Sequence, residues 1–534
     1  MSTLLVGLFA IGAALASAVS AFVWIRVRRN SPWGNALIVA LVPLCVYAVM
    51  TVAIVKTTHP GGGIWITSRL TPSVALTRGH EVYSTRTEGV VQTTMYPPMW
   101  VVSYLPVAVG ATPAQVLRIG LLLTLLFSFV PVVLLLVHGS PTVSQGILGS
   151  ASFILASMWF DSLSFSLFLP HADAPSLGYA MAACWLTLRS GPLTRRRVAL
   201  VALLAWFSVL SKQVMAPILV ALPMWFLVVH GLRQCLRLFG WLAVTGVGMA
   251  ALLIPFFGLE GVLFNCLTIP ARVPWNAGHS RFVMALAVFA DLLIVSVPLV
   301  LLLTVCAVAS VTLRSRSSAS TTGLKTFLGD NSWTLPAGVA LCMVPVSVLG
   351  RVKMGGYTNT YSPTTYFLLA AAVLATIAVA RRLRDHAGPI AHQAGLGATA
   401  LCAGILAVSG TARVIFDADS PLRDHPSQQA YDYLVGEDSR AYFPMHPLAH
   451  LLADGSYLHY SPSLYDREYL ARLPLSSSQR QSHLPVDPSI VCVDKAEETG
   501  KWWPKNYFTE YTRRIEVRSL ERWWWCSTRQ PGHT

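Results

Sequence analysis

The sequence predicts a mostly α fold: a polytopic bundle of about twelve transmembrane helices, followed by a small outer domain of α/β or α+β type. The 534 residues are 54% hydrophobic and 12% charged, with a mean hydropathy of +0.56. Soluble globular chains carry roughly twice that charged fraction. Hydrophobic runs of about 18 to 25 residues recur up to residue 412, each long enough to cross a bilayer. A cytosolic enzyme, a secreted disulfide scaffold and a fibrous protein are therefore excluded.

The spans follow from the hydrophobic runs and the polar segments between them. The first run lacks a basic start and is followed by Arg28 and Arg29, so we interpret it as a retained span and not as a cleaved signal peptide. We expect spans near residues 3–25, 34–55, 115–137, 144–160, 173–189, 197–211, 213–230, 237–257, 283–309, 333–350, 363–380 and 391–411.

The charges orient this bundle. Lys and Arg number 39 against 24 Asp and Glu, a net charge of +15. The excess lies in short loops between alternate spans, and such basic loops mark the cytoplasmic side of a membrane. We therefore expect a multi-pass cell-membrane protein with both termini and its active face outside the cytoplasm, and no nucleic-acid partner. The basic loops contain Arg26, Arg28, Arg29, Arg189, Arg195, Arg196, Arg197, Arg233, Arg237, Arg314, Arg316, Lys325, Arg381, Arg382 and Arg384.

Two domains result from this division. Residues 1–412 form the membrane domain, with a large first outer loop at 56–98, and residues 413–534 form a soluble extracytoplasmic domain. In this outer domain we expect a helix near its start, two strands, and tryptophans that belong to its core or to the membrane interface. The corresponding ranges are 427–434 for the helix, 489–493 and 514–518 for the strands, and 502–503 and 523–525 for the tryptophans.

The chain has nine cysteines. Those in or beside the spans are typical small buried hydrophobes. Cys492 and Cys526 are the two that fall in the outer domain. On an oxidising face they form one disulfide, and the alternative is a pair of free buried thiols.

Several common enzyme motifs are absent from the sequence. It contains no Walker A, GxGxxG, GxSxG or HExxH pattern, which argues against an ABC-type ATPase, a Rossmann domain, a standard serine hydrolase and a zincin. No CxxC or Cys/His ligand spacing occurs either. We predict no cofactor and no structural zinc; a divalent metal is neither excluded nor indicated.

The first outer loop is too long and too polar to be a simple connector. Residues 68–78 read as a short helix that Gly79 ends, and residues 99–109 as a second helix lying along the membrane. Two surface helices at the mouth of a bundle can build a cavity that lipids reach.

Carboxylates are scarce in the membrane domain, and those expected to face outward are Glu81, Glu88, Asp161, Asp173 and Glu260. A base that deprotonates an acceptor hydroxyl must be a positioned side chain of this kind. Asp173 stands in the segment His171-Ala-Asp173 at the start of a span, where it is a catalytic candidate or a helix cap. Asp291 lies inside a span, where it is functional or pairs helices.

Outward-facing cations could bind an anionic group. Arg351 and Lys353 precede a Gly-Gly bend at the mouth of a span, which suits a phosphate because Arg offers bidentate contacts; the alternative is snorkelling at the interface. Lys212 adds a cation at the outer end of another span. The whole set is Lys56, Arg69, Arg78, Arg86, Lys212, Arg272, Arg281, Arg351 and Lys353.

The chain resembles the GT-C superfamily of polyprenyl-phosphate-sugar-dependent membrane glycosyltransferases, which includes protein O-mannosyltransferases, the aminoarabinose transferase and related uncharacterised bacterial proteins. The matching segments, in order, are ALTRGHEVY at 75–83, YPP at 96–98, HADA at 171–174, SKQ at 211–213, GGYTN at 355–359 and, in the tail, AYFPMHPLAH at 441–450. The resemblance implies a substrate cavity lined by Tyr83, Tyr96, His171, Gln213, Tyr357 and Asn359.

The family carries a catalytic Asp or Glu early in the first outer loop, but residues 57–68 contain no carboxylate here. If the activity is retained, the base comes from elsewhere, and we expect Glu88 as base with Asp173 assisting and Glu81 as the other candidate. A polyprenyl-phosphate-linked sugar would then be the donor, and a lipid or glycan of the cell envelope the acceptor. Cations would neutralise the leaving phosphate: Arg351, Lys353, Lys212 and Arg272.

Two other functions fit parts of the pattern. A transporter or flippase for a lipid-linked or anionic substrate suits twelve spans and outward cations, although alternating access requires neither the long first loop nor the outer tail. A non-catalytic envelope scaffold suits the missing early carboxylate.

Overall fold

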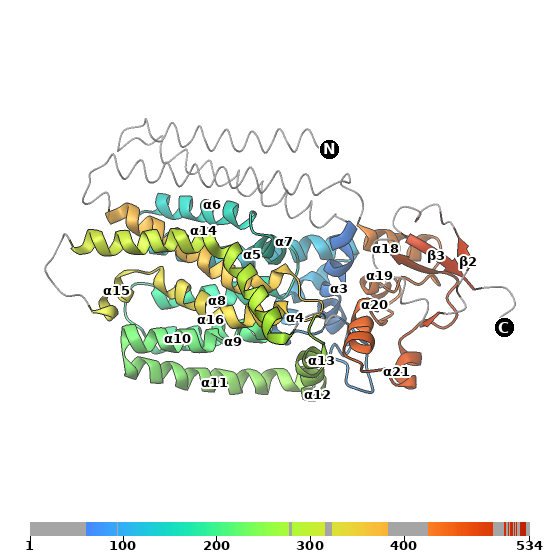
Figure 1. The fold of residues 1–534 in the computed structure, drawn as a ribbon. Coiled ribbons are helices and arrows are strands. Elements are labelled where there is room, and N and C mark those ends of the chain that lie inside the picture. Colours follow the sequence, from blue (N-terminus) through green and yellow to red (C-terminus); the bar gives the residue numbers. More distant parts are fainter. Residues whose placement is uncertain are drawn as a thin grey trace, which may run out of the picture.

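The protein is a bundle of helices with a smaller domain at one end (Figure 1). The computed structural model describes residues 60–382 except 93, 277–279 and 316–322, then residues 425–494, and finally residues 507–508, 511, 513–515, 517, 520 and 524–529. Within these residues six helices are long and apolar enough to cross a membrane, or seven if one bent pair counts as a span. The protein is thus a polytopic membrane protein.

The nine predicted spans that fall in the described residues are all helical, although three of these helices are shorter than 18 residues. The predicted spans 3–25, 34–55 and 391–411 lie outside the described residues, so the total of twelve is not confirmed. The bundle consists of α5 (Pro113–Gly139), α6 (Val143–Ser157), α7 (Asp161–Phe168), α8 (Asp173–Leu188), α9 (Arg195–Ser211), α10 (Ile218–Trp225) with flanking turns η2 (Gln213–Met215) and η3 (Phe226–His230), α11 (Leu232–Phe257), α14 (Arg281–Ser315), α15 (Leu324–Asp330), α16 (Thr334–Arg351) and Thr358–Arg382, which begins with the turn η5 (Thr358–Tyr361).

Threonine side chains cap three of these helices. Each accepts a hydrogen bond from the backbone N–H three residues later, and so satisfies one of the free donors at a helix N-terminus. The caps are Thr112 on α5, Thr142 on α6 and Thr194 on α9. Pro113 follows the first of them, at a position where its missing N–H costs nothing.

Helix α8 lies at the centre of the bundle, packed between α5 and α9. Twelve of its residues are buried, small ones such as Ala180 and Ala183 among them. The closest approach is at Gly178, where an added Cβ would lie 2.3 Å from the carbonyl oxygen of Phe127 on α5. Glycine at this position therefore sets the spacing of α5 and α8.

The short helices gather at one end of the bundle, beside the tail (Figure 1). Helix α3 spans Pro60–Thr77, so the predicted loop helix exists but starts earlier, and it ends as expected before Gly79, whose φ is +83°. The predicted helix over 99–109 is divided at Tyr104 into α4 (Met99–Ser103) and the 3₁₀ turn η1 (Leu105–Val109). The same end carries α12 (Leu259–Leu263), the π-helical turn η4 (Phe264–Thr268) and α13 (Ile269–Arg272).

The described tail is a small α+β unit. Its sheet has three antiparallel strands in the order β1-β3-β2, and the predicted helix and both predicted strands are present. Cys492 and Cys526 face each other in the β1–β3 register and form the expected disulfide. The elements are α18 (Pro426–Gly436), α19 (Pro447–Ala453), α20 (Ser461–Leu464), the π-helical turn η6 (Tyr465–Leu470), α21 (Ser477–Ser482), β1 (Val491–Asp494), β2 (Arg513–Ile515) and β3 (Trp524–Thr528).

Aromatic residues divide between the tail's own core and its junction with the bundle. Trp524 is buried against Phe443 and His446, which confirms a core position for this tryptophan. Trp502, Trp503 and Trp523 lie outside the described residues. Leu448 and Leu451 of α19 belong to the same apolar cluster as the bundle, so the tail shares a continuous core with it.

Tail groups hold the backbone of the first outer loop. The N–H of Val91 donates to Nδ1 of His459 (2.9 Å), whose Nε2 donates to the carbonyl of Gln479 (3.0 Å). Burial lowers the pKa of His459 to about 3, so the ring stays neutral and keeps this acceptor. The Gln479 side chain bonds the carbonyl oxygen of Glu88 (2.9 Å), and Arg467 bonds that of Arg86 (2.7 Å). The loop conformation therefore depends on the tail.

Replacing Gly178 by Ala should destabilise the bundle by about 1–3 kcal/mol, because the new methyl group meets backbone that cannot move aside cheaply. Gly248→Ala is the matched control, since an added Cβ there has no heavy atom within 4 Å. Thermal unfolding of the two purified variants measures the difference. Equal midpoints would show that α5 and α8 separate without cost.

Stability of the tail should decrease as the pH rises towards 7. Burial raises the pKa of Asp466 to about 7 from 3.8, so the folded tail binds a proton that the unfolded chain has already released above pH ~4. The stabilisation by this bound proton is complete below pH ~4 and is lost as the pH rises through 7. Each unit of pKa shift corresponds to about 1.4 kcal/mol of the free energy of unfolding.

The Asp466→Asn variant should therefore unfold at a higher temperature than the wild type at pH 8 and at the same temperature at pH 4. Asp432→Asn, at an exposed position, is the control. Equal unfolding temperatures of the wild type and Asp466→Asn at both pH values would contradict a raised pKa of Asp466.

Candidate active site

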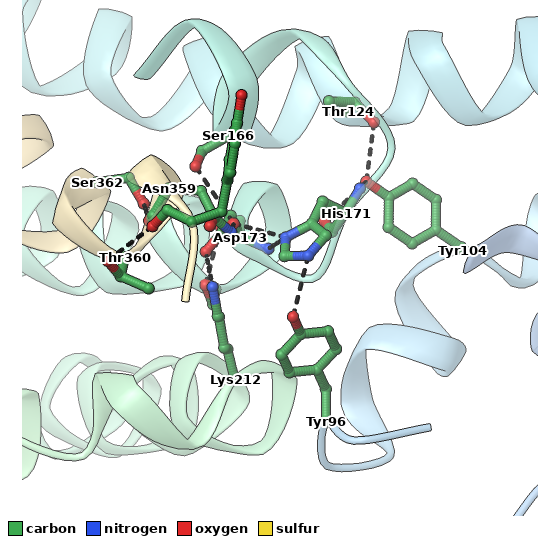
Figure 2. A network of polar contacts seen from close by, with 12 residues as sticks. Tyr96, Tyr104, Thr124, Ser166, His171, Asp173, Lys212, Asn359, Thr360 and Ser362 are labelled. Atoms are coloured by element: carbon green, nitrogen blue, oxygen red, sulfur yellow. Dashed lines mark hydrogen bonds and ion pairs between the residues drawn. The ribbon is translucent and has the colours of Figure 1, made fainter. Parts of the chain in front are cut away.

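A buried carboxylate, Asp173, lies at the N-terminus of α8 (Figure 2). Side chains from separate elements converge on it. Lys212 forms an ion pair with its Oδ1, and Nδ1 of His171 lies 2.5 Å from its Oδ2. Nδ2 of Asn359 donates to Oδ2 at 2.9 Å, and Oγ of Ser166 donates to the same oxygen at 3.2 Å.

The local structure explains how these groups meet. The chain bends by 107° between α6 and α7, which brings Ser166 back towards the start of α8. Helix α9 ends at Ser211, and the extended backbone of Lys212 directs its side chain across to α8. The turn η5 carries Asn359. The hydroxyl of Ser362 donates to the backbone carbonyl of Asn359 (2.6 Å). Side chains from four segments of the chain thus meet at the Asp173 carboxylate.

A buried carboxylate is tolerated only when its charge and its lone pairs are satisfied. Here Lys212 supplies the opposite charge, and His171, Asn359 and Ser166 supply hydrogen bonds. Asp173 is more than a helix cap: it stands at the first position of α8, after the N-cap residue Ala172, and its side chain connects α8 to three other segments.

Two groups compete for Nδ1 of His171: the Asp173 carboxylate at 2.5 Å and the Asp173 backbone N–H at 3.2 Å. A bare lone pair facing a carboxylate at 2.5 Å would be repulsive, so Nδ1 carries the proton and donates it to Asp173. The other ring nitrogen, Nε2, then accepts from the hydroxyl of Tyr96 at 3.1 Å. Figure 2 shows the resulting line from Asp173 through His171 to Tyr96.

Tyr104 fixes the position of His171. The hydroxyl of Tyr104 donates to the carbonyl of His171 (3.3 Å) and bonds Thr124 on α5 at 2.8 Å. The segment that bears Tyr96 is held similarly: the Tyr83 hydroxyl donates to the carbonyl of Tyr96 (2.6 Å), and Nε2 of Gln213 donates to that of Met95 (2.9 Å). Both ends of the Tyr96–His171 bond are therefore pre-positioned.

Arg69 on α3 lies next to this network. Its guanidinium carbon is 5.3 Å from the ring centroid of Phe165 and 5.8 Å from that of Trp65. In the described part of the chain its buried Nε and Nη1 have no hydrogen-bond partner. Burial lowers the pKa of Arg69, and among its neighbours Tyr96 opposes this most, followed by Tyr460 and Asp173. The site therefore holds a cation with unused donors.

The structure brings together some of the predicted site residues. Tyr96, His171, Asp173, Lys212 and Asn359 form one network, and Tyr83 and Gln213 support it through backbone contacts. Tyr357 is 59% exposed, with its ring 5.4 Å from Phe165. Lys212, expected to bind a phosphate, is instead paired with Asp173.

The other predicted residues lie apart from this network. Glu81 and Glu88 are exposed on the first outer loop. Arg351 donates to the carbonyl of Gly356, Lys353 donates to that of Pro270, and Arg272 is exposed on α13. Asp291 accepts a hydrogen bond from the Tyr361 hydroxyl at 2.8 Å. Arg351, Lys353 and Arg272 are thus grouped around the C-terminal ends of α13 and α16.

Sequence reasoning did not assign a role to Ser166, Tyr104 or Thr124, and counted Arg69 only as one of nine outward cations. The hydroxyl groups carry no signal in the sequence, because Ser and Thr are frequent in these helices. Arg69 has a weak one: a lone arginine in an otherwise uncharged helix. Among the described residues no group of three or more His, Cys, Asp or Glu side chains could hold a metal ion.

Comparison with known proteins defines the class of this fold. No family model and no curated protein sequence matches the chain. The solved structure of ArnT from Cupriavidus metallidurans bound to undecaprenyl phosphate is similar, with a TM-score of 0.51 and 12% identity over 92% of this chain and 98% of that one. The chain therefore shares the fold of this ArnT structure, and ArnT belongs to the GT-C superfamily that the sequence resembles.

Two further solved structures are similar at lower scores. Apo ArnT from the same organism has a TM-score of 0.48 and 14% identity over 92% of this chain and 98% of that one. The oligosaccharyltransferase AglB from Archaeoglobus fulgidus, in complex with an inhibitory peptide and a dolichol-phosphate, has a TM-score of 0.41 and 11% identity over 88% of this chain and 72% of that one. The fold assignment depends on the first structure.

Breaking the Asp173–Lys212 pair should destabilise the protein strongly. Lys212→Met leaves a buried carboxylate without its counter-charge, which costs about 3–5 kcal/mol. The double variant Asp173→Asn/Lys212→Met removes both charges and should regain much of that loss. A double-mutant cycle from thermal or denaturant unfolding measures the coupling.

The control for this cycle is the more exposed pair Arg480–Glu468, whose atoms are 3.7 Å apart. Arg480→Gln should cost no more than about 1 kcal/mol. If Lys212→Met cost equally little, the charge of Asp173 would not be what holds the four segments together.

Proposed function

We propose that the protein is a membrane glycosyltransferase that moves a sugar from a polyprenyl-phosphate donor to a cell-envelope acceptor on the outer face. The fold supports this proposal, because ArnT, whose fold it shares, was solved with undecaprenyl phosphate bound. In this assignment the end of the bundle that carries α3, α13 and the tail faces outward, and membrane lipids surround the remaining helices. The proposal names the substrates by class: the donor is a lipid-linked sugar, and the acceptor is a lipid or a glycan.

The charge at the site is the observation that carries the proposal. Asp173 is balanced by Lys212, and His171 is neutral in the arrangement described above, so Arg69 leaves the site with one uncompensated positive charge. Its unpartnered Nε and Nη1 are N–H donors of a charged group, and such donors bind phosphate oxygens well. A phosphate placed there would satisfy both the charge and the donors.

Arg69 would act mainly as the bond to phosphate breaks. When a sugar leaves its polyprenyl phosphate, negative charge grows on the phosphate oxygens, and a fixed cation in a dry site stabilises that growth. Arg351, Lys353 and Arg272 form a second basic group around α13 and α16. We assign them to the approach of the lipid phosphate and Arg69 to the reacting phosphate.

The test uses the full chain in nanodiscs with a panel of polyprenyl-phosphate sugars and an envelope extract as acceptor. Release of free polyprenyl phosphate should occur with at least one donor. Arg69→Gln should lower kcat/KM by about 10- to 100-fold, the range expected when a charge-assisted contact worth about 1.5–3 kcal/mol is lost. Arg118→Gln, an exposed cation on α5, is the control and should behave as the wild type.

The outcomes separate the three functions. Release without loss in Arg69→Gln would keep the transferase and overturn the role of Arg69. No release from any donor, with substrate movement across vesicles, would identify a transporter. Neither release nor movement would favour a scaffold.

A further inference from the structure

Because residues 57–68, the early part of the first outer loop, contain no carboxylate, it is open which group removes the proton from the acceptor hydroxyl. Glu81 and Glu88 are exposed, and their loop is held against the tail. Asp173 is buried, and both of its oxygens already accept hydrogen bonds or an ion pair. A carboxylate so occupied is a poor direct acceptor for a substrate proton, so another group has to face the substrate.

From the line Asp173–His171–Tyr96 we infer that Tyr96 is the catalytic residue that takes the acceptor's proton and passes its own to His171. This inference rests on the proposed transferase function. It names a residue type and a route that differ from a carboxylate acting directly as base.

The geometry supplies each part of such a relay. His171 is 1% exposed, so a substrate cannot reach its Nε2 directly. That nitrogen accepts the Tyr96 hydroxyl at 3.1 Å, and Tyr96 itself is only partly buried. On the far side of the ring, Nδ1 donates to Asp173, which orients the imidazole and stabilises the cation that forms when Nε2 is protonated.

Two cationic side chains lie next to Tyr96. Nζ of Lys212 lies 5.4 Å from the centroid of the Tyr96 ring. Arg69 interacts electrostatically with Tyr96 more strongly than with any other side chain. Both cations stabilise negative charge on the phenolic oxygen while its proton moves to His171.

The step balances as follows. The acceptor oxygen forms a bond to the anomeric carbon, and the bond from that carbon to the donor phosphate breaks, with its electron pair leaving on the phosphate. The acceptor's proton moves to the Tyr96 oxygen as the Tyr96 proton moves to Nε2 of His171. The imidazolium then returns its proton through Tyr96 to water or to the departing phosphate.

Three variants test the relay in the full chain. Tyr96→Phe removes only the hydroxyl, and His171→Asn keeps a donor for Asp173 but has no second ring nitrogen. Each should lower kcat by about 10²- to 10⁴-fold, the usual contribution of acid–base groups, with the donor KM changed only a few-fold. The double variant should lose no more than the worse single one, because the two residues act as a unit.

Controls separate this route from its alternatives. Tyr179 lies on the same helix as Asp173, and its hydroxyl bonds Oγ of Ser103 at 3.0 Å. Tyr179→Phe removes that hydroxyl and should leave kcat unchanged. Glu88→Gln and Glu81→Gln should also leave it unchanged. Additive losses in Tyr96→Phe and His171→Asn would contradict a shared role.

The pH profile adds a readout that a purely structural role would not change. Burial lowers the pKa of His171 to about 3, while Asp173 raises it and Arg69 and Lys212 lower it further, so wild-type kcat/KM should fall only at low pH, as His171 becomes protonated. His171→Asn should lack that acid limb.

Failure of the relay can be told apart from failure of the proposed function. If the wild type transfers sugar and Tyr96→Phe keeps its full kcat, the relay is overturned and the transferase stands. If Glu88→Gln abolishes transfer while Tyr96→Phe does not, the base lies on the first outer loop. If the wild type transfers nothing from any donor, the proposed function itself fails.

Discussion

The structure depends on one buried charge. A carboxylate in the interior must be neutralised and hydrogen-bonded, and Asp173 obtains this from α7, α9 and η5 at once. Side chains of these elements meet at the Asp173 carboxylate. The contacts that keep Asp173 ionised therefore also fix the position of His171 and, through its hydrogen bond, that of the Tyr96 hydroxyl. Stability and the geometry of the site therefore have the same origin.

The tail supports the site indirectly, through the first outer loop. The backbone of the first outer loop finds its hydrogen-bond partners in tail residues such as His459, Gln479 and Arg467, and α19 shares its core with the bundle. Since Tyr96 lies near the end of that loop, its approach to His171 depends on contacts made far away in the sequence. A change in the tail would thus reach the site without touching it.

Relocating the proton acceptor has a physical consequence. Glu81 and Glu88 are exposed and solvated, whereas Tyr96 is held at its backbone by Tyr83 and at its hydroxyl by His171. A held acceptor needs no reorganisation when the reaction occurs, and a nearby Arg69 can stabilise the phosphate and the tyrosine oxygen together. One cation then serves both the leaving group and the base.

The sequence by itself determined the helical membrane class, nine helices, the tail's helix and strands, and the Cys492–Cys526 pair, because bilayer length, periodicity and cysteine count are local or compositional properties. It also placed Asp173 among the few outward acids. Only the tertiary structure decided that Lys212 neutralises Asp173, that Glu88 is exposed and that Arg69 has unused donors. The site is built from side chains up to 186 residues apart, such as Asp173 and Asn359, and no local pattern encodes such a meeting.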